Sequence, residues 1–132
     1  MEKLYNIYET ISSKKNNPIT LEITKNTEKA PYMGSMFNQD VEPSGTYVTQ
    51  GYVEDDKYIN GKAFLNNPLF INTTTGDINY KKMLAKKYNA TGKSLTNKLM
   101  KLGYDAIITI LEDYNNEYGE IVLFPNAKFM MT

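Results

Sequence analysis

The sequence has no cysteine and no histidine, and its 15 basic residues are all lysine. Without cysteine, the chain cannot form a disulfide framework, a thiolate metal site or a cysteine nucleophile. Without histidine, a Ser-His triad and a histidine general base are excluded. Any metal ion would be bound by carboxylates alone, which suits magnesium or calcium better than zinc. We predict no metal site.

Arginine is also absent, so the chain lacks the bidentate donor that suits phosphate, carboxylate or guanine. The 15 lysines balance 15 acidic residues, and the formal net charge is zero. These features argue against sequence-specific nucleic-acid binding and against an acidic DNA mimic. No apolar run has the length of a membrane span or the form of a signal peptide, so we expect no membrane partner and a cytoplasmic location.

With 132 residues, the chain is long enough for one domain with a substantial core, and we predict a single domain over residues 1–132. Helical periodicity predicts helices at residues 2–12, 78–88 and 94–102, and one helical turn at residues 54–58. Strands are predicted at residues 19–23, 32–37, 46–52, 62–65, 69–71, 106–111 and 121–124, and near Phe129. This order of elements indicates an α+β fold with mostly antiparallel pairing toward the C-terminus.

Two short patterns allow a chemical or a purely structural interpretation. The sequence Gly-Lys-Ser at residues 92–94 matches the end of a phosphate-binding loop, but Lys87 stands where the loop needs its first glycine and no strand precedes it. A turn between two helices, with Ser94 as the cap, is the better interpretation. Asp40 and Glu42 would point the same way in an extended segment and could bind a cation or a partner. As residues of a turn they need no ligand.

Four stretches combine small, aromatic and acidic residues at the ends of predicted strands. Each alone is also explained by turn glycines and core aromatic residues. They are Tyr32, Met33, Gly34 and Ser35; the Gly-x-Tyr-φ-Thr pattern of residues 45–49, φ being apolar; Asn-Pro-Leu at residues 67–69; and Leu-Gly-Tyr-Asp-Ala-Ile-Ile at residues 102–108, followed by Glu120 at the mouth of the predicted strand at residues 121–124. In this order and spacing, over roughly residues 31–128, they resemble the ADP-ribosyltransferase fold family, especially its small members from bacteriophages, toxins and mobile elements.

The resemblance implies an α+β fold with an ADP-ribosyltransferase-like split β-sheet core and N-terminal and central helices. It also implies an enzyme that splits the nicotinamide–ribose bond of NAD and transfers ADP-ribose to a host macromolecule. Glu120 matches the carboxylate that orients the ribose hydroxyl and stabilises an oxocarbenium-like transition state.

The resemblance further implies that NAD is bound by two groups of residues. Tyr47 would stack on nicotinamide, and Thr49 would supply a hydroxyl group from the same strand. Gly34 would let the backbone approach the amide group of nicotinamide, and Ser35 would contact the ribose or a phosphate. The first group consists of Tyr32, Met33, Gly34 and Ser35. The family normally has histidine or arginine at the position of Met33, whose side chain cannot donate a hydrogen bond.

Two functions therefore follow from the sequence. One is a mono-ADP-ribosyltransferase, encoded by a phage or mobile element, that uses NAD to modify a host protein or other macromolecule. The other is a catalytically degenerate member of the fold that inhibits a host defence or toxin protein by direct binding. A third interpretation is a structural accessory protein of a phage. The NAD-dependent function requires Glu120 and Tyr47 to lie in one hollow.

Overall fold

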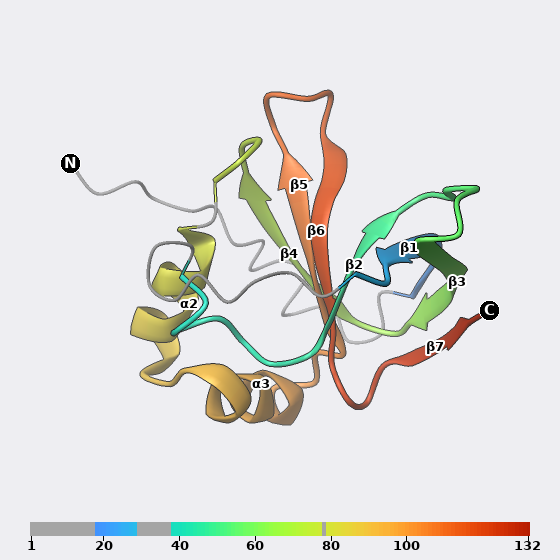
Figure 1. Ribbon diagram of the computed structural model, residues 1–132. Coiled ribbons are helices and arrows are strands. Elements are labelled where there is room, and N and C mark those ends of the chain that lie inside the picture. The colour runs from blue at the N-terminus through green and yellow to red at the C-terminus, as the bar shows by residue number, and fades with distance from the viewer. Residues whose placement is uncertain (1–17, 29–37, 78) are drawn as a thin grey trace.

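The computed structural model describes residues 18–28, 38–77 and 79–132, which contain seven strands and two helices (Figure 1). The predicted helix at residues 2–12 and the predicted strand at residues 32–37 lie outside the described residues. The strands are β1 (Ile19–Asn26), β2 (Thr46–Gln50), β3 (Tyr58–Leu65), β4 (Pro68–Thr73), β5 (Ala106–Leu111), β6 (Glu117–Leu123) and β7 (Lys128–Met131). The helices α2 (Tyr80–Tyr88) and α3 (Gly92–Lys101) connect β4 to β5.

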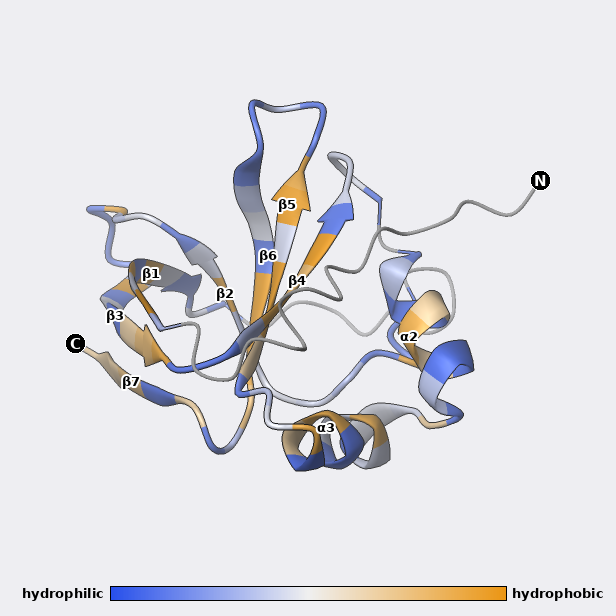
Figure 2. Cartoon of the chain, turned by 180° about the vertical axis from the view of Figure 1, so that it is seen from behind, coloured by the Kyte–Doolittle hydropathy of each residue, from blue (hydrophilic) through white to orange (hydrophobic). Residues whose placement is uncertain are grey.

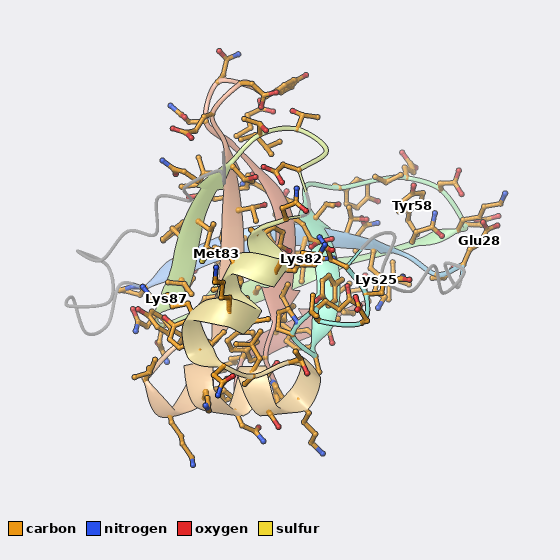
Figure 3. The ribbon with its side chains drawn as sticks, turned by 90° about the vertical axis from the view of Figure 1, so that its left-hand side faces the viewer. Lys25, Glu28, Tyr58, Lys82, Met83 and Lys87 are labelled. Carbon is orange, nitrogen blue, oxygen red and sulfur yellow. The ribbon has the colours of Figure 1, made fainter. Side chains whose placement is uncertain are left out.

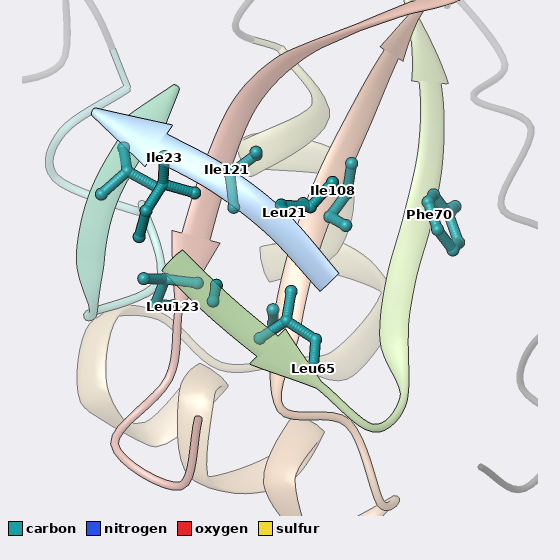
Figure 4. Packing of buried hydrophobic residues seen from close by; sticks show 10 residues of the cluster. Leu21, Ile23, Leu65, Phe70, Ile108, Ile121 and Leu123 are labelled. Carbon is teal, nitrogen blue, oxygen red and sulfur yellow. The ribbon is translucent and has the colours of Figure 1, made fainter. Parts of the chain in front are cut away.

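The strand order in the sheet is β4-β5-β6-β2-β1-β3-β7. All neighbouring strands are antiparallel except β4 and β5, which are parallel and are joined through the two helices. The predicted α+β class with mostly antiparallel pairing is therefore confirmed. The sheet does not lie flat, because β1 and β3 cross over β5 and β6 (Figure 4).

Two hydrophobic clusters stabilise this arrangement. β5 contributes side chains to both clusters, so it is apolar along most of its length. The hairpin that joins β5 to β6 is hydrophilic by contrast (Figure 2). The first cluster lies between the crossing strands and includes Leu21, Ile23, Leu65, Ile108, Ile121 and Leu123. The second lies between the other face of β4, β5 and β6 and the two helices, and includes Leu69, Ile71, Leu84, Leu95, Leu99 and Val122.

The alternation of side chains along β6 determines the face on which Glu120 lies. Ile121 belongs to the first cluster and Val122 to the second. Because successive side chains point to opposite faces, Glu120 shares the helix side of the sheet with Val122. Tyr47 is paired with Val122 across the β2–β6 ladder and packs against the second cluster. The fold thus places Glu120 and Tyr47 on the same side of the sheet.

The connection between β2 and β3 differs from its prediction. Residues 54–58 do not form a helical turn. The Asp55 side chain accepts a hydrogen bond from the backbone N–H of Lys57 at 2.8 Å, which closes a tight turn instead. Tyr58 then begins β3 and pairs with Asn26, so β1 continues three residues beyond the strand predicted at residues 19–23.

Helix α3 begins earlier than predicted. It starts at Gly92, so Ser94 lies inside its first turn and is not its cap. The backbone N–H of Ser44 donates to the Gly92 carbonyl at 3.3 Å, and this contact from a distant loop holds the first turn. The predicted end of the helix is confirmed, because Gly103 follows it with a positive φ of +100° that favours glycine.

Candidate functional site

A hollow of about 420 Å³ lies across four strands that are consecutive in the sheet, β6, β2, β1 and β3. It combines a carboxylate, two tyrosine rings and threonine hydroxyl groups, which is a lining suited to a polar ligand with a planar part. The lining residues are Gly119 and Glu120 of β6; Tyr47, Val48 and Thr49 of β2; Thr24, Lys25 and Asn26 of β1; and Tyr58 of β3.

Three residues selected by the sequence motifs line this one hollow: Glu120, Tyr47 and Thr49. They come from two strands that are adjacent in the sheet and distant in the sequence. The structure therefore meets the requirement that Glu120 and Tyr47 share a hollow. The remaining predicted residues lie outside the described part of the chain; they are Tyr32, Met33, Gly34 and Ser35.

The carboxylate of Glu120 is held from one side by helix α2. The Tyr80 hydroxyl donates a hydrogen bond to Glu120 Oε1, and the ammonium nitrogen of Lys81 lies 3.4 Å from the same oxygen. The Glu120 side chain is 37% exposed. Among the residues that the structure describes, Glu120 Oε2 has no hydrogen-bond partner. Oε2 is therefore the oxygen that can accept a hydrogen bond from a ligand in the hollow.

Lys81 is the buried centre of a charged group that we call the Lys81 cluster: Lys81, Glu42, Glu120, Tyr47 and Tyr80. Its side chain is only 5% exposed, and its Nζ lies 2.9 Å from Glu42 Oε2. The same nitrogen lies 5.2 Å from the centroid of the Tyr47 ring and 6.0 Å from that of Tyr80. Two carboxylates and two aromatic rings thus compensate for removing this ammonium group from water.

Both tyrosines of the Lys81 cluster keep their protons. Burial raises the pKa of Tyr80 well above its ordinary value of 10.0, and the charge of Glu120 and the hydrogen bond to it raise it further. Burial also raises the pKa of Tyr47, with smaller contributions from the charges of Glu42 and Glu120. The hydroxyl of Tyr80 is therefore a hydrogen-bond donor to Glu120, and that of Tyr47 donates to the Pro43 carbonyl.

We expect the protein to lose stability as the pH rises above about 10. A tyrosine whose pKa is raised by folding gives stability that is complete below the unfolded pKa and is lost as the pH rises toward the folded pKa. Between its unfolded and its folded pKa, each such tyrosine lowers the free energy of unfolding by up to about 1.4 kcal/mol for each unit by which the pH rises. Urea denaturation between about pH 9 and about pH 11 should show a shallower loss for Tyr80→Phe than for the wild type. Tyr114→Phe, at an exposed position, should match the wild type, and equal slopes for all three proteins would contradict the prediction.

The role of α2 in this site is not among the features predicted from the sequence. Lys81 lies three residues before the buried Leu84, so it occupies the apolar stripe of its own helix, and a lysine at such a position indicates a buried partner. The sequence gives Glu42, together with Asp40, as a possible cation ligand. Within the described structure, the cation it binds is the ammonium group of Lys81.

In comparisons with known proteins, no family model, no curated protein and no solved structure matches this chain. Among the described residues, no helix has the length and apolar character needed to cross a membrane. Nor does the described structure group three or more acidic side chains as ligands for a metal ion.

Proposed function

We propose that the protein is an NAD-dependent mono-ADP-ribosyltransferase with an ADP-ribosyltransferase-like split β-sheet core and Glu120 as its catalytic carboxylate. It would act in the host cytoplasm as an effector of a phage or mobile element. The observation that carries the proposal is that Glu120, Tyr47 and Thr49 line one hollow. The motifs that resemble the family select the same three residues without reference to their positions in space.

In the proposed reaction the bond between nicotinamide and the ribose of NAD breaks, and its electron pair leaves with nicotinamide. Positive charge develops on the ribose, where a carboxylate stabilises it more strongly in the transition state than in the substrate. Glu120 Oε2 accepts a hydrogen bond from a ribose hydroxyl, while Tyr80 and Lys81 hold Oε1. A nucleophile of the acceptor then bonds to the ribose carbon and loses its proton.

In this proposal the Tyr47 ring binds nicotinamide, which is the leaving group. Its hydroxyl is hydrogen-bonded to the Pro43 carbonyl, and the Lys81 ammonium group lies over its ring. These two contacts fix the ring in the wall of the hollow. A planar nicotinamide group would stack against the ring face that is turned away from Lys81.

The test is incubation with host lysate and NAD labelled in its adenylate half, with nicotinamide release and label transfer as the two measurements. We expect the wild type to release nicotinamide and Glu120→Gln to be slower by at least about 100-fold. Glu117→Gln is the matched control, because Glu117 is exposed on the same strand. Absence of nicotinamide release from the wild type, or equal rates for Glu120→Gln and the wild type, would reject the proposal.

Inhibition of a host defence or toxin protein by direct binding is the second candidate function. It is favoured by the Lys81 cluster, in which the charge of Glu120 is already compensated, and by the absence of arginine and histidine from the chain. This function predicts that a pull-down from host lysate captures one partner in stoichiometric amount. Glu120→Gln should leave that capture unchanged, whereas the same substitution removes the transferase activity under the first proposal.

A further inference from the structure

The formal net charge of the chain is zero, but its charges are unevenly distributed. Residues 78–104, which include α2 and α3, contain seven lysines and no acidic residue. Lys81 is buried between Glu42 and Glu120, whereas the other six lysines are exposed. We call these six the lysine face: Lys82, Lys86, Lys87, Lys93, Lys98 and Lys101.

A group of acidic residues lies far from the lysine face. Glu112, Asp113 and Glu117 are exposed in and beside the hairpin that joins β5 to β6. This hairpin and α3 lie at opposite ends of the molecule (Figure 1). The two signs of charge are therefore separated, and the lysine face attracts an anion although the whole chain is neutral.

The packing of α2 and α3 turns their lysines toward solvent. Three buried leucines fix both helices in the second cluster: Leu84, Leu95 and Leu99. The opposite side of each helix is therefore turned away from the sheet. Figure 3 shows Lys82 and Lys87 on α2, which faces the viewer. Lys98 of α3 donates a hydrogen bond to the carbonyl of Tyr88, the last residue of α2, at 2.8 Å, so the lysines of the two helices belong to one surface.

Neighbouring lysines on these helices repel one another. Lys82 and Lys86 are four residues apart on α2, and Lys98 and Lys101 are three residues apart on α3. Like charges at these spacings destabilise a helix. A polyanion bound along the lysine face would reduce this repulsion, and that gain would add to its affinity.

The surroundings of the lysines favour a hydrated polyanion over a membrane surface or a protein. A helix that binds a membrane surface inserts an apolar stripe, and protein interfaces are enriched in aromatic residues and methionine. Within α2 and α3, which the structure describes in full, no large apolar side chain is exposed. Leu102, which follows α3, is exposed, but a single side chain does not form such a stripe.

Neutral hydrogen-bonding residues are exposed between the lysines: Asn89, Thr91, Ser94 and Asn97. Together with lysine, side chains of these types make many of the contacts that proteins form with the phosphate and sugar groups of nucleic acids. Lysine acts on a phosphate as a point charge. Contacts to phosphates carry no sequence information, so binding through them does not depend on the base sequence.

We propose that the lysine face binds the phosphate backbone of a nucleic acid without sequence preference. The inference rests on the charge and exposure of α2 and α3 and does not depend on the proposed function. Lysines that neutralise phosphates release counterions, so binding should weaken steeply as the salt concentration rises. With about four such contacts, the logarithm of the association constant for duplex DNA should fall with a slope of about −4 against the logarithm of salt concentration.

The test is fluorescence anisotropy of a short labelled DNA duplex and of a labelled RNA strand, between about 50 mM and about 200 mM salt. Lys82→Gln/Lys87→Gln on α2 and Lys93→Gln/Lys101→Gln on α3 each remove two charges. We expect each double variant to bind at least about tenfold more weakly at low salt and to have a slope for the duplex that is shallower by about 2. Lys93→Arg/Lys101→Arg keeps both charges and should bind as the wild type does.

Lys62→Gln/Lys128→Gln is the matched control, because it removes two exposed lysines from β3 and β7 and leaves the lysine face unchanged. Weaker binding in the helix variants than in this control supports the inference, and the probe that binds identifies DNA or RNA. The inference is overturned if the wild type binds neither probe at low salt, if the helix variants match the control, or if duplexes of unrelated sequence differ by more than about tenfold. Equally tight binding of polyglutamate or of phosphatidylserine vesicles would overturn the assignment to nucleic acid.

Discussion

Asp105→Ala is expected to lower the free energy of unfolding by about 3 kcal/mol. Asp105 is 6% exposed, and its carboxylate accepts hydrogen bonds from the backbone N–H groups of Asn66 at 2.7 Å and Asn67 at 3.1 Å. These two residues form the tight connection between β3 and β4. Alanine would leave the buried amide of Asn67 without a partner and the amide of Asn66 to water, at a cost that is a large part of the stability of a small domain.

Asp105→Asn is the matched control for this prediction. Its amide oxygen can accept one of the two hydrogen bonds, so about half of the lost free energy should be recovered. Urea denaturation of the wild type and both variants at neutral pH gives the comparison. A loss below about 1 kcal/mol in Asp105→Ala, or equal losses in the two variants, would contradict this role for the carboxylate.

The same contacts divide the family-like motifs into two kinds. The Asn67 side chain donates to the Gly103 carbonyl at 3.1 Å, and the Asp105 carboxylate holds the backbone of Asn67. The motifs at residues 67–69 and 102–108 thus contact each other and stabilise the fold. In contrast, Tyr47 and Glu120 line the hollow. Some of the motifs that resemble the family therefore stabilise the fold, and others supply the residues of the candidate site.

The sequence predicts the bounds of β5 correctly. Residues 106–111 are apolar except for Thr109, and β5 has the same bounds. The sequence predicts a polar hairpin at residues 114–119, but residues 117–119 belong to β6. Pairing with β5 makes this segment a strand. Gly119 allows close approach, since a Cβ atom there would lie 2.8 Å from Thr109 Oγ1.

The site could be predicted only in part for a related reason. Tyr47 and Thr49 lie on a strand that the sequence predicts, and Glu120 belongs to a motif directly before the predicted strand at residues 121–124, so all three could be selected from local sequence. Lys81 and Glu42 act through a contact between a helix and a distant loop, which no local pattern encodes. The spacing of residues within each motif also could not show that Glu120 forms an ion pair with Lys81.

Lys81→Met is expected to lower the free energy of unfolding by about 2 kcal/mol. Methionine has a similar volume and can occupy the same apolar environment, so the main loss is electrostatic. Without the ammonium group, Glu42 and Glu120 become two neighbouring carboxylates with no cation between them. Their side chains are 28% and 37% exposed, so water stabilises both charges and keeps the cost below that of a fully buried pair.

A double-mutant cycle separates this electrostatic cost from packing. Glu42→Gln alone should lower the free energy of unfolding by less than about 1 kcal/mol, and the same change in Lys81→Met should recover about half of the loss. Lys82→Met is the control, because Lys82 is exposed on the same helix and its substitution should change stability by no more than about 0.5 kcal/mol. Additive losses in the cycle would mean that Lys81 stabilises the protein by packing alone. In that case the position of the Glu120 carboxylate would depend on the hydrogen bond from Tyr80.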